Sequence, residues 1–537
     1  MRYLLHDVFT DSVKTVPNNT AIINEDGTRI SYLELNERSN QYAHILMSLK
    51  EDVRSNPYVG ILSCVNKESI AGILGCLKIG CAYVPLDEYS PVERLHHIIK
   101  NTKLNIILLD SIWFEKYREL IECAEIEAVI LLDNKLSYVT NYSKKIILHS
   151  EVIRYSIADF PEKNQVCDDL AYILHSSGST GVPKGIMLSH RNARTFVDWM
   201  HKEFALKESD IIMSRAPFKF DLSVFDIFNT FKAGATLVCF DWNKKREGDR
   251  KHQDYVKLME HEKASILYTT PSTFISLMNR GGLSNAKLSL RTVMYAGEPF
   301  PIPQLRKLTN ILPNVKIANI YGPTETNIIT YYWINTVPDS DSDDIPLGYV
   351  VEDTEIIVVS DEHSRICEPN ELGELWCRGG TVTLGYLGLA DKTAENLVLS
   401  PFHKFPAFFW RTGDYGFVDS EGLLHYRGRK DHMIKVKGFR IELGEVENAI
   451  SGFDGIDEFV VVAKKDEKYG NRLYCYYSSL EGYHIENDDF ITYVKKKLPE
   501  YMLPYKFIEL PELPKTSSGK IDRVFLQNSY EPQIRNL

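Results

Sequence analysis

The 537-residue sequence lacks several features that would point to particular classes of protein. Its nine cysteines form no C-x-x-C pair and no Cys/His cluster with zinc spacing, so we expect neither a structural zinc site nor a disulfide framework. No apolar run approaches the length of a membrane span, and the N-terminus has no signal-peptide core. These absences favour a cytoplasmic protein with reduced thiols and no membrane partner.

Basic residues are scarce relative to acidic ones. The chain has 62 Lys and Arg against 73 Asp and Glu, for a net charge of −11. Proteins that bind nucleic acid need a basic surface, so we expect no nucleic-acid partner. The hydrophobic content of 44% is normal for a globular protein, and the length requires at least two domains.

The most informative segment is residues 169–185, where an apolar run from Leu170 to Leu174 leads into a loop of small residues. The loop residues that could bind a ligand are Ser176, Ser177, Gly178, Ser179, Thr180, Gly181 and Lys184. Glycines let successive backbone N–H groups face one concavity, and the hydroxyls and the lysine add donors, which together suit a phosphate. The spacing is not that of a Walker A loop. A flexible linker is the plain alternative, but a linker needs neither the lysine nor a preceding strand.

Strands and helices alternate through the first part of the chain. We expect strands at Thr20–Asn24, Val59–Leu62, 82–85 and 106–109, with helices between them, including one over 67–78. This alternation predicts parallel sheets covered by helices. Beyond residue 431 the pattern changes to a small α+β region, with helices at Gly444–Ile450 and Asn487–Leu498 around strands at Phe459–Ala463 and Arg472–Tyr477.

Asp221 lies inside an aromatic and aliphatic run, residues 217–228. Burying a carboxylate without a partner destabilises a fold by roughly several kcal/mol, so we expect Asp221 to pair with a cation. That cation is either a Lys or Arg of the protein or a positively charged group of a ligand.

Further motifs follow in order along nearly the whole chain. They are Phe-Asp-Leu-Ser at 220–223, Tyr-Gly-Pro-Thr-Glu-Thr at 321–326, Trp-Arg-Thr-Gly-Asp at 410–414, Gly-Arg-Lys-Asp at 428–431, and Ser-Gly-Lys at 518–520. Together with the loop at 169–185, they resemble the motifs of adenylate-forming enzymes, specifically the amino-acid adenylation domains of nonribosomal peptide synthesis. The resemblance implies an α/β fold. A large N-terminal domain of stacked mixed and parallel sheets with helices (1–429) would be joined through a hinge (430–431) to a small mobile α+β lid (432–537).

The resemblance also implies an ATP site. Its residues would be Ser176, Ser177, Gly178, Ser179, Thr180, Gly181, Lys184, Gly297, Glu298, Tyr321, Gly322, Thr324, Asp414 and Arg429. Tyr321 would lie against the adenine, and Asp414 would accept hydrogen bonds from the ribose, as paired carboxylate oxygens can. Glu325 and Thr180 would hold Mg²⁺, which prefers hard oxygen ligands.

The lid residues have implied roles of their own. Lys520 matches the catalytic lysine of the family, Asp431 the hinge about which the lid rotates, and Lys437 and Gly438 the channel for a pantetheine thiol. The stretch around Tyr386 departs from the family pattern at Leu384, where arginine is common, and we assign it no catalytic role.

In the resembling domains, the aspartate at the position of Asp221 holds the α-ammonium group of an amino acid. The implied pocket lining is Leu222, Phe225, Tyr268, Met294, Ala296, Ile320, Ile328 and Ile329. Except for the Tyr268 hydroxyl, nothing in this lining could pair with a polar substrate side chain, so polar side chains should be rejected. The lining most resembles that of stand-alone L-proline-activating enzymes. D-alanine–carrier protein ligases are close competitors because they share the Phe-Asp-Leu-Ser start.

The expected function is therefore ATP-dependent activation of a small apolar amino acid, followed by its transfer to a carrier protein. Too few residues follow Lys520 for a carrier domain, so we expect the carrier to be a separate phosphopantetheinylated protein in an alkaloid or pyrrole pathway. The alternatives are the same chemistry with D-alanine or another small apolar amino acid, and a non-catalytic adenylate-binding relative. The presence of Lys184, Glu325, Asp414 and Lys520 argues against the last.

Overall fold

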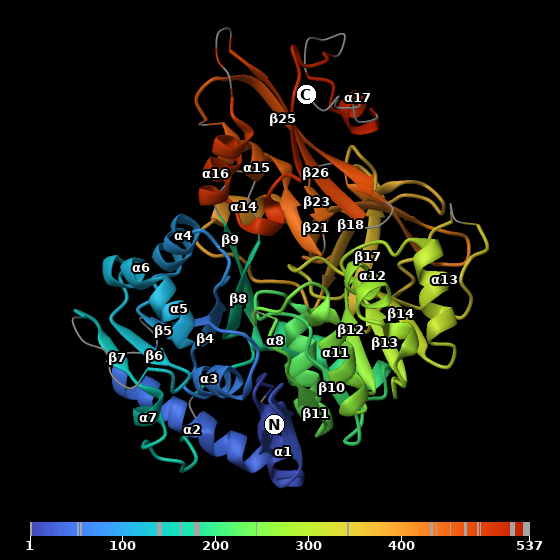
Figure 1. Cartoon of the computed structure of the whole chain (residues 1–537). Coiled ribbons are helices and arrows are strands. Elements are labelled where there is room, and N and C mark those ends of the chain that lie inside the picture. Colours follow the sequence, from blue (N-terminus) through green and yellow to red (C-terminus); the bar gives the residue numbers. More distant parts are fainter. Residues whose placement is uncertain are drawn as a thin grey trace. The chain divides into compact units, whose positions relative to one another are not determined.

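The computed structural model describes residues 3–50, 53, 56–136, 142–161, 164–176, 183–242, 244–340, 343–429, 433–436, 438–451, 453–466, 470–480, 483, 485–515 and 521–529. The chain divides into two units (Figure 1). The first consists of Met1–Glu88, Ile98–His175 and Gly185–Lys430, and the second of Tyr89–His97, Ser176–Lys184 and Asp431–Leu537.

One sheet of the first unit has the strand order β16-β15-β14-β13-β12-β10-β11-β1-β2. Its strands are β1 (Thr20–Ile23), β2 (Arg29–Ser31), β10 (Ile211–Met213), β11 (Thr236–Val238), β12 (Ile266–Thr269), β13 (Thr292–Tyr295), β14 (Lys316–Tyr321), β15 (Thr330–Trp333) and β16 (Tyr349–Val350). The strands from β14 to β1 in this order run parallel, and the pairs β1–β2, β14–β15 and β15–β16 are antiparallel. The carboxyl ends of β12, β13 and β14 therefore meet at one edge, where ligands of α/β proteins usually bind.

A second sheet has the order β19-β9-β8-β4-β3-β5-β6-β7. Its strands are β3 (Tyr58–Leu62), β4 (Ala82–Pro85), β5 (Ile106–Leu109), β6 (Ala128–Leu131), β7 (Lys145–Ile147), β8 (Leu170–Ser176), β9 (Lys184–Ser189) and β19 (Gly385–Tyr386). The pairs from β8 to β7 are parallel, and the strands expected at 82–85 and 106–109 are confirmed. β19 is far away in sequence and pairs antiparallel with β9.

The third sheet is antiparallel throughout and was not expected. It contains β17 (Thr354–Val359), β18 (Gly373–Gly379), β20 (Leu397–Leu399), β21 (Phe408–Val418) and β22 (Leu424–Arg429). The alternation of strands and helices predicted parallel sheets only for the first part of the chain. An antiparallel sheet at this place was not predicted, although the family resemblance implied mixed sheets, and a short turn joins β21 to β22. Gly422 in that turn has a φ of +85°, a backbone conformation that glycine adopts without steric cost.

The helices of the first unit are α1 (Asp7–Thr15), α2 (Tyr32–Leu49), α3 (Lys67–Lys78), α5 (Ser111–Lys116), α6 (Arg118–Cys123), α7 (His149–Val152), α8 (His190–Glu203), α9 (Leu222–Val224), α10 (Thr230–Ala233), α11 (Arg250–His261), α12 (Pro271–Arg280), α13 (Ile302–Ile311) and α14 (Ala390–Asn396), and α4 (Val92–Thr102) is shared between the units. Four helices of the first unit, α2, α3, α8 and α12, begin at a residue whose side chain caps the first turn. Ser31 caps α2 in a capping box with Glu34, and the Asn66 side chain accepts from the first turn of α3. The helix predicted over 67–78 is confirmed as α3.

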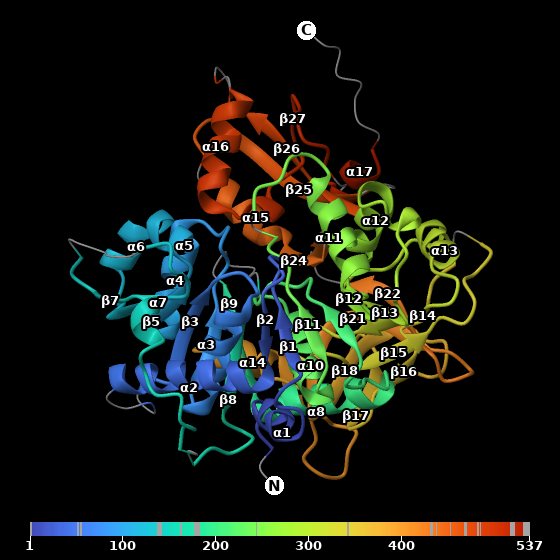
Figure 2. The same cartoon turned by 60° about the horizontal axis from the view of Figure 1, so that its bottom comes forward.

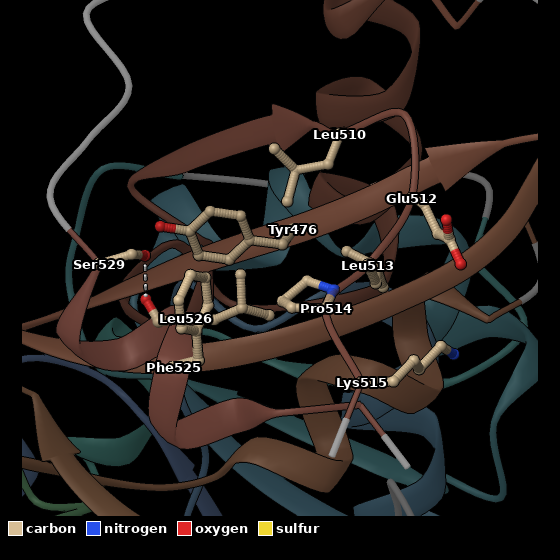
Figure 3. Close-up of a pocket in the computed structure, with 9 residues that line it drawn as sticks. All are labelled: Tyr476, Leu510, Glu512, Leu513, Pro514, Lys515, Phe525, Leu526 and Ser529. Carbon is tan, nitrogen blue, oxygen red and sulfur yellow. Dashed lines mark hydrogen bonds between the residues drawn. The ribbon is translucent and has the colours of Figure 1, made fainter. Parts of the chain in front are cut away.

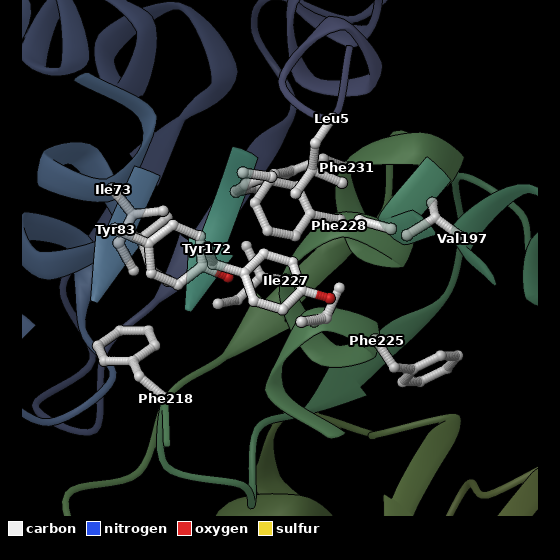
Figure 4. Close-up of a cluster of buried hydrophobic side chains, with 14 of the residues drawn as sticks. Leu5, Ile73, Tyr83, Tyr172, Val197, Phe218, Phe225, Ile227, Phe228 and Phe231 are labelled. Atoms are coloured by element: carbon white, nitrogen blue, oxygen red, sulfur yellow. The ribbon is translucent and has the colours of Figure 1, made fainter. Parts of the chain in front are cut away.

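In the main core cluster of the first unit, side chains of the second sheet pack together with side chains of the segment that follows Asp221 (Figure 4). The rings of Tyr83 and Tyr172, which are register partners on β4 and β8, lie 5.3 Å apart. Phe225 and Phe228, a few residues after Asp221, are completely buried in the same cluster. Burying such side chains contributes about 1.5–3 kcal/mol each, so the segment after Asp221 is anchored in the core.

The second unit is a small α+β arrangement (Figure 2). Its elements are β23 (Met433–Val436), β24 (Phe439–Glu442), α15 (Leu443–Ile450), β25 (Ile456–Asp466), β26 (Gly470–Ser479), α16 (Asn487–Lys497), β27 (Lys506–Glu509) and α17 (Arg523–Asn528). Val461 and Cys475 pack on the α15 and α16 side of the β25–β27 sheet, whereas Val460 and Tyr476 pack with Leu526 of α17 on the other face. This alternation is that of a strand buried on both faces. The predicted α+β character is confirmed, and β27 is an additional strand.

Among the described residues, no helix combines the length and the apolar character needed to cross a membrane.

Candidate active site

The residues predicted to line an amino-acid pocket come together at the carboxyl ends of β12, β13 and β14. Tyr268 is the register partner of Met294, and Met294 pairs with Ala318, two residues before Ile320 on the same strand face. Phe225, Tyr268, Met294, Ala296, Ile320, Ile328 and Ile329 belong to one buried cluster, against which Leu222 packs. All eight residues therefore lie in or against the main core cluster of the first unit.

Asp221 stands at the start of a short distorted helical segment. It precedes α9, which continues into a π-helical turn at Phe225–Asn229. Such turns occur often at functional sites because they shift the side chains that follow. The Phe225 ring lies edge-on to the Tyr268 ring, with 5.2 Å between centroids. The two rings therefore reduce the space available in the predicted pocket.

The charge of Asp221 acts on two buried phenols. Burial raises the pKa of Tyr268 well above its ordinary value, and the carboxylates of Asp221 and Asp226 raise it further. Burial also raises the pKa of Tyr172, with Asp221 again adding to the effect. Both phenols therefore stay protonated, and the negative potential in this region suits an ammonium group.

A second aspartate in the same segment has a different environment. Asp226 is completely buried and accepts hydrogen bonds from the backbone N–H groups of Arg215, at 3.1 Å, and Ala216, at 3.4 Å. Burial raises the pKa of Asp226 to about 8. Its bonds tie the chain before Asp221 to the helical segment after it. The sequence alone did not reveal this structural role.

Asp414 is the centre of a buried polar group at the other end of the site. The Tyr321 hydroxyl donates to Oδ2 of Asp414 over 2.5 Å, and Nη1 of Arg429 donates to Oδ1 over 2.9 Å. Asp414 on β21 and Arg429 on β22 are register partners. Gly413 has a φ of +71°, and a Cβ there would lie 2.4 Å from the Arg429 guanidinium, so a side chain would displace the arginine.

An aromatic ring that sequence reasoning missed lies beside this group. The ring centroid of Tyr426, on β22, is 6.3 Å from that of Tyr321. Tyr426 precedes the Gly428–Asp431 motif by two residues, so the signal that could have found it was its position on the strand leading into that motif.

The turn after β14 is tight and brings Glu325 into the interior. A Cβ on Gly322 would lie 1.9 Å from the carbonyl oxygen of Asn327, so only glycine fits there. Thr324 lies in this turn, and Glu325 is 1% exposed. The Tyr386 hydroxyl donates to Oε1 of Glu325 over 2.7 Å.

The carboxylate of Glu325 is a hard oxygen ligand of the kind that magnesium accepts. Among the described residues, no group of three or more His, Cys, Asp and Glu side chains could hold a metal ion. Magnesium is typically bound by one or two carboxylates, with phosphate oxygens and waters completing the octahedron. The Glu325 carboxylate, which is 1% exposed, is a ligand of the type that such a magnesium ion accepts.

Gly297 and Glu298 lie next to the start of α12. Gly297 has a φ of +92°, and the Glu298 carboxylate accepts from the backbone N–H of Ser272 over 3.2 Å. The first turn of a helix has unpaired N–H groups and a positive partial charge, which this carboxylate stabilises.

Some of the remaining predicted residues lie at the ends of described segments, and the others lie outside the described residues. Ser176 ends β8, and in the second unit Nζ of Lys184 lies 2.9 Å from Oε1 of Glu442. Gly438, between β23 and β24, has a φ of +84°. Ser177, Gly178, Ser179, Thr180, Gly181, Asp431, Lys437 and Lys520 lie outside the described residues.

The second unit also has a cavity of about 500 Å³ (Figure 3). It is lined by Tyr476, Leu510, Glu512, Leu513, Pro514, Lys515, Phe525, Leu526 and Ser529. None of these residues was predicted to bind a substrate.

Two family profiles match the chain. The profile of the AMP-binding enzyme matches residues 9–387, and that of the AMP-binding enzyme C-terminal domain matches residues 445–520. An L-proline--[L-prolyl-carrier protein] ligase of Pseudomonas fluorescens is 32% identical over 529 residues, which cover 98% of this chain and 99% of that protein. Bacitracin synthase 3 of Bacillus licheniformis is 32% identical over 97% of this chain, but the match spans only 8% of that much longer protein.

Solved structures share the fold. The adenylation domain AlmE of Vibrio cholerae, in complex with glycyl-adenosine-5'-phosphate, has a TM-score of 0.83 and 20% identity, covering 98% of this chain and 97% of that one. IdnL1 has a TM-score of 0.78 and 24% identity, covering 96% and 99%. The predicted fold class is confirmed by these likenesses.

Proposed function

The chain belongs to the AMP-binding enzyme family, and from that premise we propose that it activates an amino acid with ATP and transfers it to a carrier protein. The amino-acid carboxylate attacks the α-phosphorus of ATP, and the bond to pyrophosphate breaks. A phosphopantetheine thiol then loses its proton and attacks the carbonyl carbon of the aminoacyl-adenylate. A carbon–sulfur bond forms as AMP leaves.

The observation that carries this proposal is the arrangement of two neighbouring residues, Ile320 and Tyr321, at the end of β14. Ile320 is buried in the core cluster that also contains Phe225, Tyr268 and Met294, and the hydroxyl of the next residue, Tyr321, donates to Asp414. Successive side chains of a strand point to opposite faces, which supports a strand end shared by the proposed amino-acid pocket and the proposed nucleotide pocket. Glu325 follows Tyr321 by four residues in the sequence. An enzyme that joins an amino acid to a nucleotide needs this proximity.

The proposed substrate is L-proline. Asp221 would hold its α-nitrogen, and the lining around Phe225 and Tyr268 would exclude polar and bulky side chains. The likeness to an L-proline--[L-prolyl-carrier protein] ligase over nearly the full length of both proteins supports this choice. D-alanine or another small apolar amino acid is the second candidate, because apolar pockets discriminate by only about 1–3 kcal/mol per methylene.

The proposed catalytic residue of the lid is Lys520, which would lie between the amino-acid carboxylate and the α-phosphate of ATP. Two anions approach each other in the first step, so the protein must neutralise charge and align the groups. Lys184 and the loop at 176–181 would cradle the phosphates. Magnesium held by Glu325 and Thr180 would neutralise charge on the departing pyrophosphate.

A rotation of the lid would separate the two half-reactions. We assign residues 1–429 to the core, 430–431 to the hinge with Asp431, and 432–537 to the lid. After the adenylate forms, rotation would withdraw Lys520 and present Lys437 and Gly438 to the incoming thiol. The carrier would be a separate protein of a natural-product pathway in the cytoplasm.

ATP–pyrophosphate exchange with all proteinogenic amino acids and D-alanine tests the proposal. Exchange driven by L-proline and abolished by Lys520→Ala is the expected result. Exchange with D-alanine or valine instead would keep the chemistry and overturn the choice of proline. Absence of exchange and of AMP formation with every amino acid, while ATP still binds, would identify a non-catalytic adenylate-binding relative.

A further inference from the structure

The side chains of Glu325 and Tyr386 meet inside the first unit. The Tyr386 hydroxyl donates to Oε1 of Glu325 over 2.7 Å, and the two residues are 5% and 1% exposed. Glu325 follows β14, whereas Tyr386 belongs to β19, so the bond links two different sheets. A buried carboxylate is costly unless it is hydrogen-bonded or paired, which makes the phenol a meaningful partner.

The backbone around Tyr386 holds the tyrosine in place for this bond. Its N–H donates to Oγ1 of Thr393 over 2.9 Å, and its ring lies edge-on to Trp410, with 5.4 Å between centroids. The N–H of Thr383 donates to the carbonyl oxygen of Glu325 over 2.7 Å. Glu325 is therefore fixed at its backbone and at its side chain by the same short segment.

The glycine before Tyr386 permits this close approach. Gly385 has a φ of +115°, and a Cβ there would lie 2.4 Å from Cγ2 of Thr393 on α14. A side chain would push β19 away from α14 and carry Tyr386 with it. Leu384, the position that departs from the family pattern, is 44% exposed and leaves the contact of Tyr386 with Glu325 intact.

We propose that Tyr386 is a positioning residue for Glu325, whose carboxylate it holds in the orientation that binds the metal–ATP complex. This proposal rests on the proposed function, in which Glu325 holds magnesium. Carboxylates that bind metal ions are commonly hydrogen-bonded by a neighbouring group as well, so the bond from Tyr386 is compatible with metal binding by Glu325. Loss of such an outer partner typically weakens metal binding by about 10–100-fold.

Tyr386→Phe removes only the hydroxyl and is the test. Mn²⁺ replaces Mg²⁺ as a paramagnetic probe with the same preference for oxygen ligands, and its binding is followed by electron paramagnetic resonance with a non-hydrolysable ATP analogue. We expect Tyr386→Phe to weaken Mn²⁺ binding by about 10–100-fold. The metal concentration for half-maximal exchange should rise in parallel, with most of the rate regained at saturating metal.

Tyr415→Phe is the matched control. The Tyr415 hydroxyl donates to the Asp361 carboxylate over 2.9 Å at the surface, so this variant also loses a phenol–carboxylate bond. Its Mn²⁺ binding should equal that of the wild type. Tyr386→His keeps a ring N–H donor and should recover part of the affinity. If Tyr386→Phe does not fold, as judged by thermal unfolding without metal, the His variant decides in its place by the same comparison.

Glu325→Gln distinguishes a failure of the proposed positioning role of Tyr386 from a failure of the proposed metal role of Glu325. If Glu325→Gln weakens Mn²⁺ binding and Tyr386→Phe does not, the positioning role of Tyr386 is overturned while the metal role of Glu325 stands. If Glu325→Gln leaves Mn²⁺ binding unchanged, the metal assignment itself fails, and the inference about Tyr386 fails with it.

Discussion

The phenol oxygen of Tyr321 and the carboxylate of Asp414 lie 2.5 Å apart in a buried pair that joins β14 to β21. Burial raises the pKa of Tyr321 well above its ordinary value, and the neighbouring Asp414 charge raises it further. The phenol therefore stays protonated and donates. Because Arg429 holds the other carboxylate oxygen, the orientation of Asp414 is set by two partners.

Asp414→Asn should raise KM for ATP with little change in KM for the amino acid. The carboxylate is the proposed acceptor for the ribose hydroxyls, and hydrogen bonds to charged groups contribute about 1.5–3 kcal/mol, roughly 10–150-fold in KM. Exchange at varied ATP and saturating amino acid measures the effect. Tyr321→Phe, which keeps the charge and its Arg429 partner, should change KM by less than about 10-fold. An unchanged ATP dependence in Asp414→Asn would remove Asp414 from the nucleotide site.

Asp221→Ala should raise KM for the amino acid and leave ATP binding intact. Removing one partner of a buried charge pair costs about 2–5 kcal/mol, so a rise of at least about 30-fold is expected. Equilibrium dialysis with a labelled ATP analogue checks the nucleotide site. Asp226→Asn is the control: this carboxyl, with its pKa of about 8, is already protonated at neutral pH, so the amino-acid KM should stay the same. The opposite pattern in the two variants would exchange the roles of the aspartates.

Phe225→Leu should shift specificity toward larger apolar amino acids. The Phe225 ring fills space edge-on to Tyr268, and a smaller side chain leaves room for additional methylene groups. One methylene is equivalent to about 1–3 kcal/mol, so the leucine-to-proline ratio of kcat/KM should rise by about 10-fold or more. Tyr268→Phe, which removes only a hydroxyl, should retain the size preference. An unchanged ratio in Phe225→Leu would place Phe225 outside the pocket.

His190 should make the first unit sensitive to acid. Nδ1 of this buried histidine accepts the N–H of Leu5 over 3.1 Å, which requires the neutral ring. Burial, with a smaller effect of Arg194, lowers the pKa of His190 to about 4 from an ordinary value of 6.5. Between these values the unfolded chain binds the proton more strongly, so the free energy of unfolding falls as pH drops from 6.5 toward 4.

The size of that effect is about 2–3 kcal/mol between pH 6.5 and 4.5, since one pKa unit corresponds to about 1.4 kcal/mol. Urea unfolding of the wild type and of His190→Asn, which keeps a side-chain acceptor, at both pH values measures the difference. The variant should lose less stability on acidification. Parallel curves for the two proteins would show that His190 does not cause the acid sensitivity.

Local features of the sequence predicted much of the fold. The helix over 67–78 follows from its apolar spacing and from Asn66 at its start, and the apolar strands at 82–85 and 106–109 from their bounded runs. The antiparallel sheet of residues 354–429 was not predicted, because β17 and β22 show no regular alternation of buried and exposed residues.

Only some features of the candidate site were predicted from the sequence. Its apolar lining was identified through the family resemblance, and the structure gathers it in one cluster. The different environments of Asp221 and Asp226 were not predictable, because two carboxylates five residues apart look alike until their surroundings are known. Tyr386 was set aside because Leu384 departs from the family pattern, although its hydroxyl reaches Glu325.

The sequence by itself determined the order of the motifs and the positions of several helices and strands, because these depend on neighbouring residues along the chain. The tertiary structure decided which side chains meet. Tyr386 is 61 residues from Glu325, and Tyr321 is 93 residues from Asp414. Such partners depend on strand order and on how separate sheets pack. Hydrophobic periodicity indicates which face of a segment is buried, but it does not identify the segment that packs against it.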